Sequence, residues 1–137
     1  MSAAHVLTPA RSGVYRTPVH VDAVRQASRD GEVWIDLDLS AVGSKSELLD
    51  AVAKALGYPG AFGRNWDALA DALQDLSWRP AEAYALHLAN AGRAGQAMGA
   101  DWATLIDILS QTAAYWKARG IAFVALIDDA TELPLWI

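Results

Sequence analysis

Residues 121–127 read Ile-Ala-Phe-Val-Ala-Leu-Ile, a run without a polar side chain. A strand that is apolar at every position is typical of a sheet covered on both faces, which is the usual state of a parallel sheet. Residues 101–119 have the clearest helical pattern in the chain, and Gly120 separates them from the apolar run. One stripe of this helix holds Trp102, Leu105, Ile106, Leu109, Ala113 and Trp116. The sequence therefore predicts a packed helix followed by a buried parallel strand.

Further strands are expected upstream of this pair. Residues 32–39 alternate, which is the pattern of a strand, and one face would hold Val33, Ile35, Leu37 and Leu39. Residues 84–89 are expected to form another strand. Near the N-terminus, residues 14–16 fit a short strand and residues 19–28 a short helix. Residues 90–100 are rich in glycine and alanine and give no clear assignment.

Two helices are expected between these strands. Ser44 with Glu47 three residues later forms a capping box, and Gly57 ends the helix that it opens. Asn65 is a suitable N-cap for a second helix that continues to about Leu76. The order strand, helix, helix, strand, helix, strand predicts an α/β fold. We expect a small three-stranded parallel sheet flanked by helices.

The length and composition fit a single domain. The chain has 137 residues, of which 53% are hydrophobic, so one core of ordinary size can form. We expect this domain to occupy residues 1–137, with its core over about residues 32–127. Residues 1–31 would then be an N-terminal extension and residues 128–137 a C-terminal tail. The tail is expected to fold back or to form a contact, because Leu133, Leu135 and Trp136 are apolar.

The charge balance indicates what kind of partner to expect. The formal net charge is -5, whereas a nucleic-acid-binding protein usually carries a basic patch. A basic protein partner is favoured instead, because complementary charge speeds encounter. The absence of cysteine excludes disulfides and thiol catalysis. No apolar run suits a signal peptide or a membrane span, so we expect a cytoplasmic protein without a membrane or nucleic-acid partner.

Residues 62–73, Phe-Gly-Arg-Asn-Trp-Asp-Ala-Leu-Ala-Asp-Ala-Leu, are the most informative for function. On a helix with about 100° per residue, Asp67, Asp71 and Asp75 form one stripe. The opposite stripe holds Trp66, Leu69, Leu73 and Leu76. Like charges four residues apart repel, by roughly 0.2–0.5 kcal/mol per pair, and a cationic partner would relieve that repulsion. The alternative is a solvated face with no binding role.

This segment resembles the signature of the barstar family of ribonuclease inhibitors. The family pattern Gly-x-Asn-x-Asp-Ala-Leu-x-Asp-x-Leu is reproduced by Gly63, Asn65, Asp67, Ala68, Leu69, Asp71 and Leu73. The resemblance extends over about residues 32–127, including the strand before it and the long helix after it. It implies a protein inhibitor without catalytic activity or cofactor. Such an inhibitor covers the active site of a basic, extracellular-type ribonuclease, as an immunity protein does in a toxin–antitoxin pair.

The resemblance also implies roles for individual residues. Asp71 would enter the active site of the ribonuclease, in the place of a substrate phosphate, and Asp67 would support it. Gly63 would let the loop before the helix approach closely. Phe62 and Asn65 belong to the same contact region.

The sequence departs from the family pattern at three positions. Ala61 stands where the family has the first of two aromatic residues, and Ala70 where it commonly has a tryptophan. Tyr115 falls near an acidic contact of the late helix, and tyrosine is common at interfaces. Trp78, near Asp75, would replace part of the missing aromatic surface. These changes leave open a second possibility, an immunity or regulatory protein for a different basic toxin.

An enzyme is the remaining alternative. Asp36 and Asp38 close one apolar strand, Asp128 and Asp129 close another, and Lys117 lies upstream. The arrangement faintly resembles a magnesium-dependent phosphatase, in which a strand-end aspartate is the nucleophile. Short motifs of this kind arise often by chance, and strand-end aspartates are common in turns. We therefore expect neither a catalytic residue nor a metal site.

Overall fold

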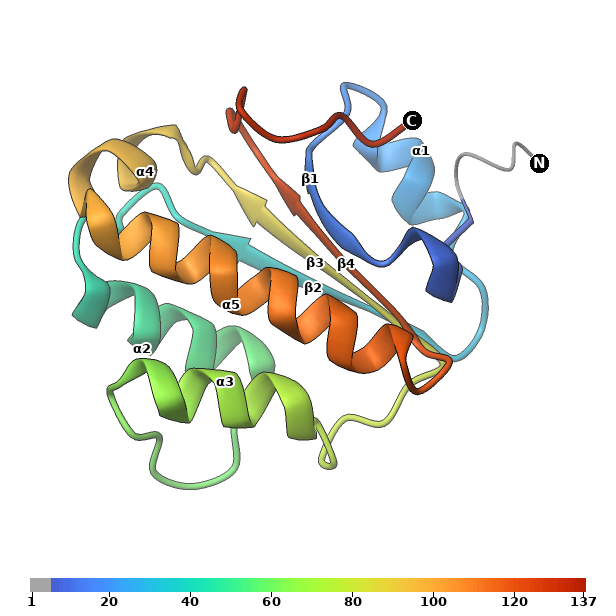
Figure 1. The fold of residues 1–137 in the computed structure, drawn as a ribbon, viewed down its shortest axis with the longest axis horizontal. Coiled ribbons are helices and arrows are strands. Elements are labelled where there is room, and N and C mark those ends of the chain that lie inside the picture. The colour runs from blue at the N-terminus through green and yellow to red at the C-terminus, as the bar shows by residue number, and fades with distance from the viewer. Residues whose placement is uncertain (1–5) are drawn as a thin grey trace.

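The computed structural model describes residues 6–137 and shows a parallel sheet with helices on both faces (Figure 1). The strands lie in the order β1-β4-β3-β2, and every neighbouring pair is parallel. Their bounds are β1 Gly13–Arg16, β2 Glu32–Asp38, β3 Ala83–Ala89 and β4 Ala122–Ile127. The helices are α1 Val21–Gln26, α2 Lys45–Leu56, α3 Trp66–Asp75, α4 Gly92–Met98 and α5 Ala100–Lys117.

The sheet has four strands, so the expected number of three is wrong. The additional strand is β1, which pairs with β4 so that Val14 lies beside Ala125 and Arg16 beside Ile127. The sequence predicted a short strand here but gave it no partner. Its pairing is with a strand far along the chain, and such a contact leaves no local pattern in four residues.

The predicted parallel strand is confirmed, because all six residues of β4 are buried. Its neighbours β1 and β3 lie on either side of it in the sheet. On one face of the sheet α2, α3 and α5 pack over a large core. That core includes Leu37, Leu48, Leu69, Leu88 and Phe123.

The second face is covered by α1 and by the residues after β4. Trp136 is 0% exposed and packs with Leu7, Val24 and Val124. Its ring lies 5.0 Å from the ring of Tyr15, edge to face. The N-terminal extension and the tail therefore form a second, smaller core together. Residues 1–5 of the expected extension lie outside the described residues.

Both predicted helix caps are present. The Ser44 side chain accepts a hydrogen bond from the Glu47 N–H, as expected of a capping box. The Glu47 carboxylate reaches back to the Ser44 hydroxyl and to the N–H of Gly43, one residue before the N-cap. Asn65 caps α3. Two helices differ from expectation. Residues 19–28 contain the shorter α1, and the glycine-rich stretch 90–100 contains α4.

Candidate functional site

Helix α3 is held firmly against the domain core. Asn65 Oδ1 accepts a hydrogen bond of 2.8 Å from the Ala68 N–H at its start. Near its end, the indole N–H of Trp116 donates to the Leu73 carbonyl at 2.8 Å. Leu69 and Leu73 are both buried beneath the helix. These contacts fix which face of α3 points to solvent.

The solvent face of α3 carries the acidic stripe that the sequence predicts. Asp67, Asp71 and Asp75 are all exposed. None of them forms an ion pair with a lysine or arginine of residues 6–137. Arg64, the nearest arginine in the sequence, pairs with Asp50 of α2 at 3.1 Å instead. The carboxylates of this stripe are therefore available to an external cation.

The loop before α3 is braced by three aromatic rings. The ring of Tyr58 lies 5.1 Å from that of Phe62 and 5.1 Å from that of Trp78, edge to face in both cases. The Trp78 indole also donates to the Leu56 carbonyl at 2.9 Å, which satisfies one of the free carbonyls at the end of α2. Trp78 thus joins the loop after α3 to the loop before it.

Tyr58 is the member of this group that sequence reasoning missed. Its position between Gly57 and Pro59 marked the end of a helix, and nothing in the sequence showed which rings it would meet. Gly63 has a local reason to be glycine, because a Cβ there would lie 3.1 Å from the Ala68 Cβ. Such a contact is tighter than ordinary packing allows.

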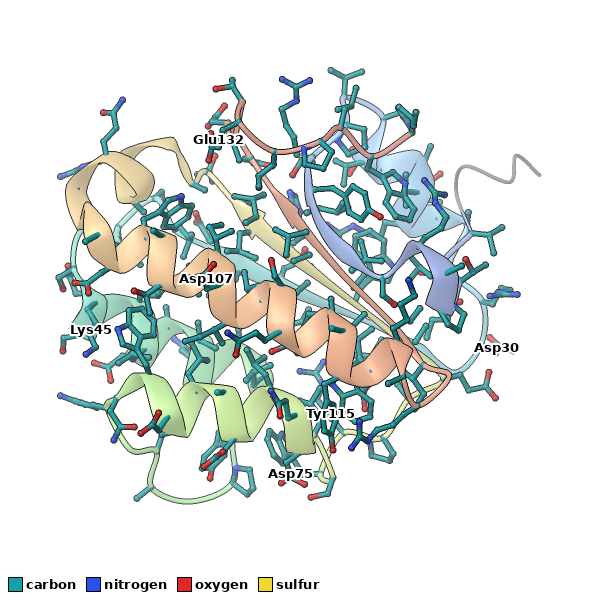
Figure 2. The ribbon with its side chains drawn as sticks, viewed as in Figure 1. Asp30, Lys45, Asp75, Asp107, Tyr115 and Glu132 are labelled. Atoms are coloured by element: carbon teal, nitrogen blue, oxygen red, sulfur yellow. The ribbon has the colours of Figure 1, made fainter. Side chains whose placement is uncertain are left out.

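The expected partner-binding residues lie on α3, on its two flanking loops and at the end of α5. Asn65 and Gly63 are exposed, whereas Phe62, Ala70 and Trp78 are half-buried. In the view of Figure 2, the labelled Tyr115 and Asp75 both lie near the end of α3. The Trp116–Leu73 hydrogen bond joins the same two helix ends. The fold therefore brings these residues to one side of the molecule.

Arg119, just beyond the end of α5, contacts Tyr115. Its guanidinium carbon lies 3.4 Å from the centre of the Tyr115 ring. Its Nη1 donates to the Tyr115 carbonyl at 2.9 Å. A cation is therefore held at the same end of α5 as Trp116, which contacts α3.

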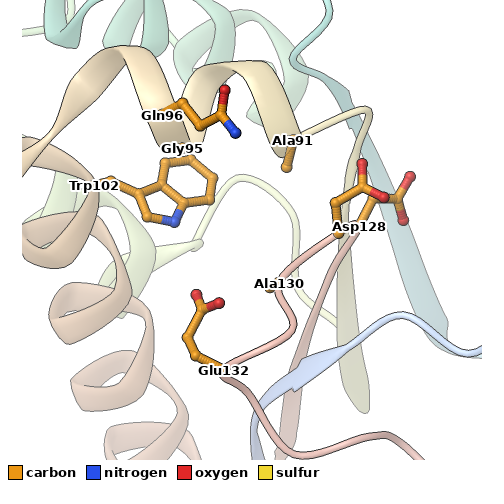
Figure 3. Close-up of a pocket in the computed structure, with 9 residues that line it drawn as sticks. Ala91, Gly95, Gln96, Trp102, Asp128, Ala130 and Glu132 are labelled. Atoms are coloured by element: carbon orange, nitrogen blue, oxygen red, sulfur yellow. The ribbon is translucent and has the colours of Figure 1, made fainter.

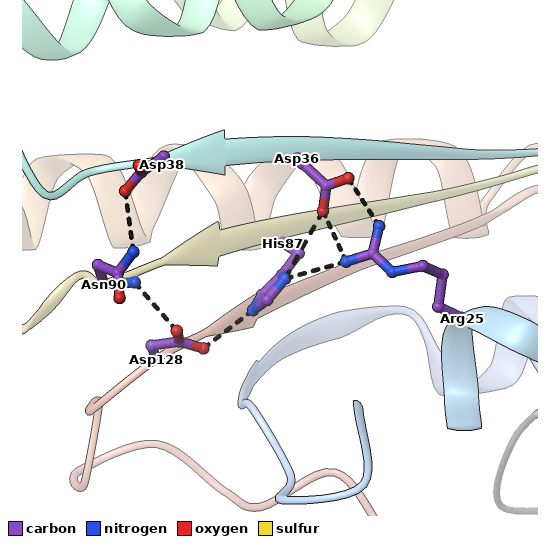
Figure 4. A network of polar contacts seen from close by, with 6 residues as sticks. All are labelled: Arg25, Asp36, Asp38, His87, Asn90 and Asp128. Carbon is purple, nitrogen blue, oxygen red and sulfur yellow. Dashed lines mark hydrogen bonds and ion pairs between the residues drawn. The ribbon is translucent and has the colours of Figure 1, made fainter. Parts of the chain in front are cut away.

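A separate polar network lies at the carboxyl ends of the strands, beneath α1 (Figure 4). Arg25 of α1 donates to both carboxylate oxygens of Asp36, at 2.6 and 2.7 Å. His87, which is 8% exposed, lies with its Nε2 2.9 Å from Asp128. Asn90 donates to Asp38 at 3.0 Å. His87 is therefore a buried histidine whose ring is engaged by neighbouring polar groups.

The network also changes the acidity of its aspartates. The hydrogen bonds from Arg25 hold the pKa of Asp36 below its ordinary value. Burial acts to raise the pKa of Asp128, but hydrogen bonds from the Asn90 backbone and from His87 outweigh it, and the pKa is lowered. Asp38 is fully exposed, and its pKa is lowered by hydrogen bonds from Asn90 and Ser40. These groups stay ionised and engaged near neutral pH.

The geometry gives the phosphatase alternative little support. Asp36 and Asp128 both lie near His87, but Asp36 is already bound by Arg25 and Asp128 by His87. Lys117 ends α5, which precedes β4, whereas Asp128 follows β4, so the two lie at opposite ends of that strand. Within residues 6–137 no group of three or more metal-binding side chains is placed to hold an ion.

A hollow of about 330 Å³ lies next to this network, at the carboxyl ends of β3 and β4 (Figure 3). It is bordered by Trp102, Asp129 and Glu132, together with the glycines of α4. A Cβ at Gly95 would lie 3.3 Å from the Trp102 ring, so glycine allows the ring to pack there. None of the expected partner-binding residues lines this hollow.

Comparison with known proteins identifies one family. The family model described as Barstar (barnase inhibitor) matches residues 33–128, from β2 to the residue after β4. No curated protein matches the chain. Over residues 6–137, no helix has the length and apolarity that crossing a membrane requires.

Proposed function

The chain belongs to the barstar family, and from that membership we propose that it inhibits a basic ribonuclease by covering its active site with α3 and the preceding loop. The observation that carries the proposal is the acidic stripe of Asp67, Asp71 and Asp75. Its three carboxylates are exposed, and no cation of residues 6–137 pairs with them. Ribonuclease active sites bind phosphates with cationic side chains, which suit such a stripe.

In this proposal each part of the surface has its own task. Asp71, at the middle of α3, enters the cleft and pairs with its cations, and Asp67 supports it one turn earlier. Phe62 and Trp78 form an apolar border beside the loop, held in place by Tyr58. A loop that is already ordered loses little conformational entropy on binding, which favours affinity.

An immunity role against a different basic toxin is the second candidate. It is favoured by Ala61 and Ala70, which leave the surface with fewer aromatic rings than the family pattern has. Ala70 is half-buried on α3, directly before Asp71. A partner with a differently shaped cleft would fit this flatter stretch of helix.

The test is a calorimetric titration against a basic ribonuclease of the barnase type, with inhibition of RNA cleavage measured in parallel. We expect binding that weakens as salt is raised, because charge complementarity is screened. We also expect Asp71→Ala to abolish inhibition while the fold is kept. Binding that is equally strong in the Asp71→Ala variant would exclude α3 as the docking element.

A further inference from the structure

A stacked tyrosine–arginine pair stands at the end of α5. The Arg119 guanidinium lies over the Tyr115 ring at 3.4 Å and donates to the Tyr115 carbonyl at 2.9 Å. These two contacts hold an otherwise flexible side chain in one place, so that little of its freedom remains to be lost on binding. Arg119 is exposed, and no carboxylate of residues 6–137 forms an ion pair with it.

The pair continues the surface that α3 presents. Tyr115 precedes Trp116, whose indole N–H donates to the Leu73 carbonyl of α3 at 2.8 Å. In the view of Figure 2, Tyr115 lies near the end of α3, where Asp75 is its last residue. A partner that lies along the acidic stripe therefore meets three carboxylates and then a positioned cation.

We propose that the Tyr115–Arg119 pair determines which ribonuclease the chain accepts. It fits a partner that presents a carboxylate beside its basic cleft, and it disfavours a partner that is basic throughout. The planar guanidinium pairs with a carboxylate through two parallel hydrogen bonds, whereas facing cations repel. This inference rests on the proposed function, since it assumes that α3 docks.

The chain offers a matched control at the same helix end. Lys117 is exposed and lies about 200° around α5 from Tyr115, on the other side of Trp116, the residue that contacts α3. Arg119→Glu and Lys117→Glu make the same change of charge and carry a similar cost from the helix dipole. A difference in ribonuclease affinity between the two variants therefore reflects where the charge lies on the surface. It does not reflect the net charge or the stability of the chain.

The experiment measures the affinity of a barnase-type ribonuclease for the wild-type chain and both variants at low salt. We expect Arg119→Glu to bind about fivefold more tightly than the wild type, the size of one exposed charge interaction. Lys117→Glu should change the affinity much less. Next, the lysines and arginines around the ribonuclease cleft are replaced by glutamate one at a time. One of these ribonuclease variants should prefer the wild-type chain over Arg119→Glu.

The outcomes separate the two proposals. Equal affinities of Arg119→Glu and Lys117→Glu, or weaker binding by Arg119→Glu, would overturn the role of the pair. The role of the pair would also be overturned if every ribonuclease variant still bound Arg119→Glu more tightly than the wild-type chain. The Asp71→Ala variant reports on docking itself: unchanged affinity in that variant contradicts the proposed function. If neither the wild type nor Arg119→Glu binds, both proposals fail.

Discussion

Asp71 and Asp75 carry the same charge on the same helix but differ in position. Asp71 lies in the middle of α3, whereas Asp75 ends it and accepts a hydrogen bond from Ser77. We expect Asp71→Ala to weaken ribonuclease binding by about 2–5 kcal/mol, because it leaves the partner's cations buried without a counter-charge. Asp75→Ala should weaken binding by less than about 1 kcal/mol, which is the usual contribution of a solvent-exposed ion pair. Equal losses by titration calorimetry would contradict this docking mode.

The contacts of a single residue could be predicted where its hydrogen-bond partner is close in the sequence. Ser44 with Glu47 and Asn65 with Ala68 are local hydrogen bonds, and their geometry follows from the helix start itself. The exposure of the acidic stripe followed from helical periodicity. The contact between Tyr58 and Trp78 depends on how separate segments pack, so no residue pattern indicated it. Tyr115 and Arg119 are four residues apart, and their contact could have been inferred from helical spacing.

At the scale of elements, α1 is tied to the sheet by charge as well as by packing. Arg25 lowers the pKa of Asp36. The folded state therefore gains stability above the ordinary aspartate pKa of 3.8, and this gain is lost as the pH falls through the lowered value. We expect Arg25→Ala to show a smaller loss of stability between pH 7 and pH 3 than the wild type.

The difference should stay below about 1 kcal/mol, because the Asp36 side chain is 57% exposed and solvent screens the pair. Urea unfolding at both pH values measures it. Arg93→Ala is the control, since Arg93 is exposed and forms no ion pair with any of residues 6–137. An identical pH dependence in the wild type and Arg25→Ala would show that the contact does not stabilise α1.

The longer strands and helices were predictable because each has its own period, whereas α4 and the pairing of β1 were not. Four residues are too few to show a period, and α4 holds two glycines and two alanines among its seven residues, which favour no single structure. The number of strands was missed for the same reason. Pairing between β1 and β4 is decided by the packing of the whole sheet rather than by either segment alone.

At the scale of the whole molecule, Trp136 holds the second core together. It is 0% exposed, and the Arg11 guanidinium lies 3.4 Å from its ring centre. We expect Trp136→Ala to lower the free energy of unfolding by about 3–5 kcal/mol, as for other large buried side chains. Its neighbour Leu135 is 41% exposed, so Leu135→Ala should cost much less. Chemical unfolding of both variants tests this, and similar losses would mean that the tail packs differently.

The position of β4 between β1 and β3 has a consequence for synthesis. On the ribosome β1 emerges early, but Gly13 finds its neighbour only when Val124 has been made. A product that stops before residue 122 lacks the strand that joins β1 to the others, and its apolar faces stay open to water. We therefore expect interrupted translation to yield fragments that do not form the complete sheet.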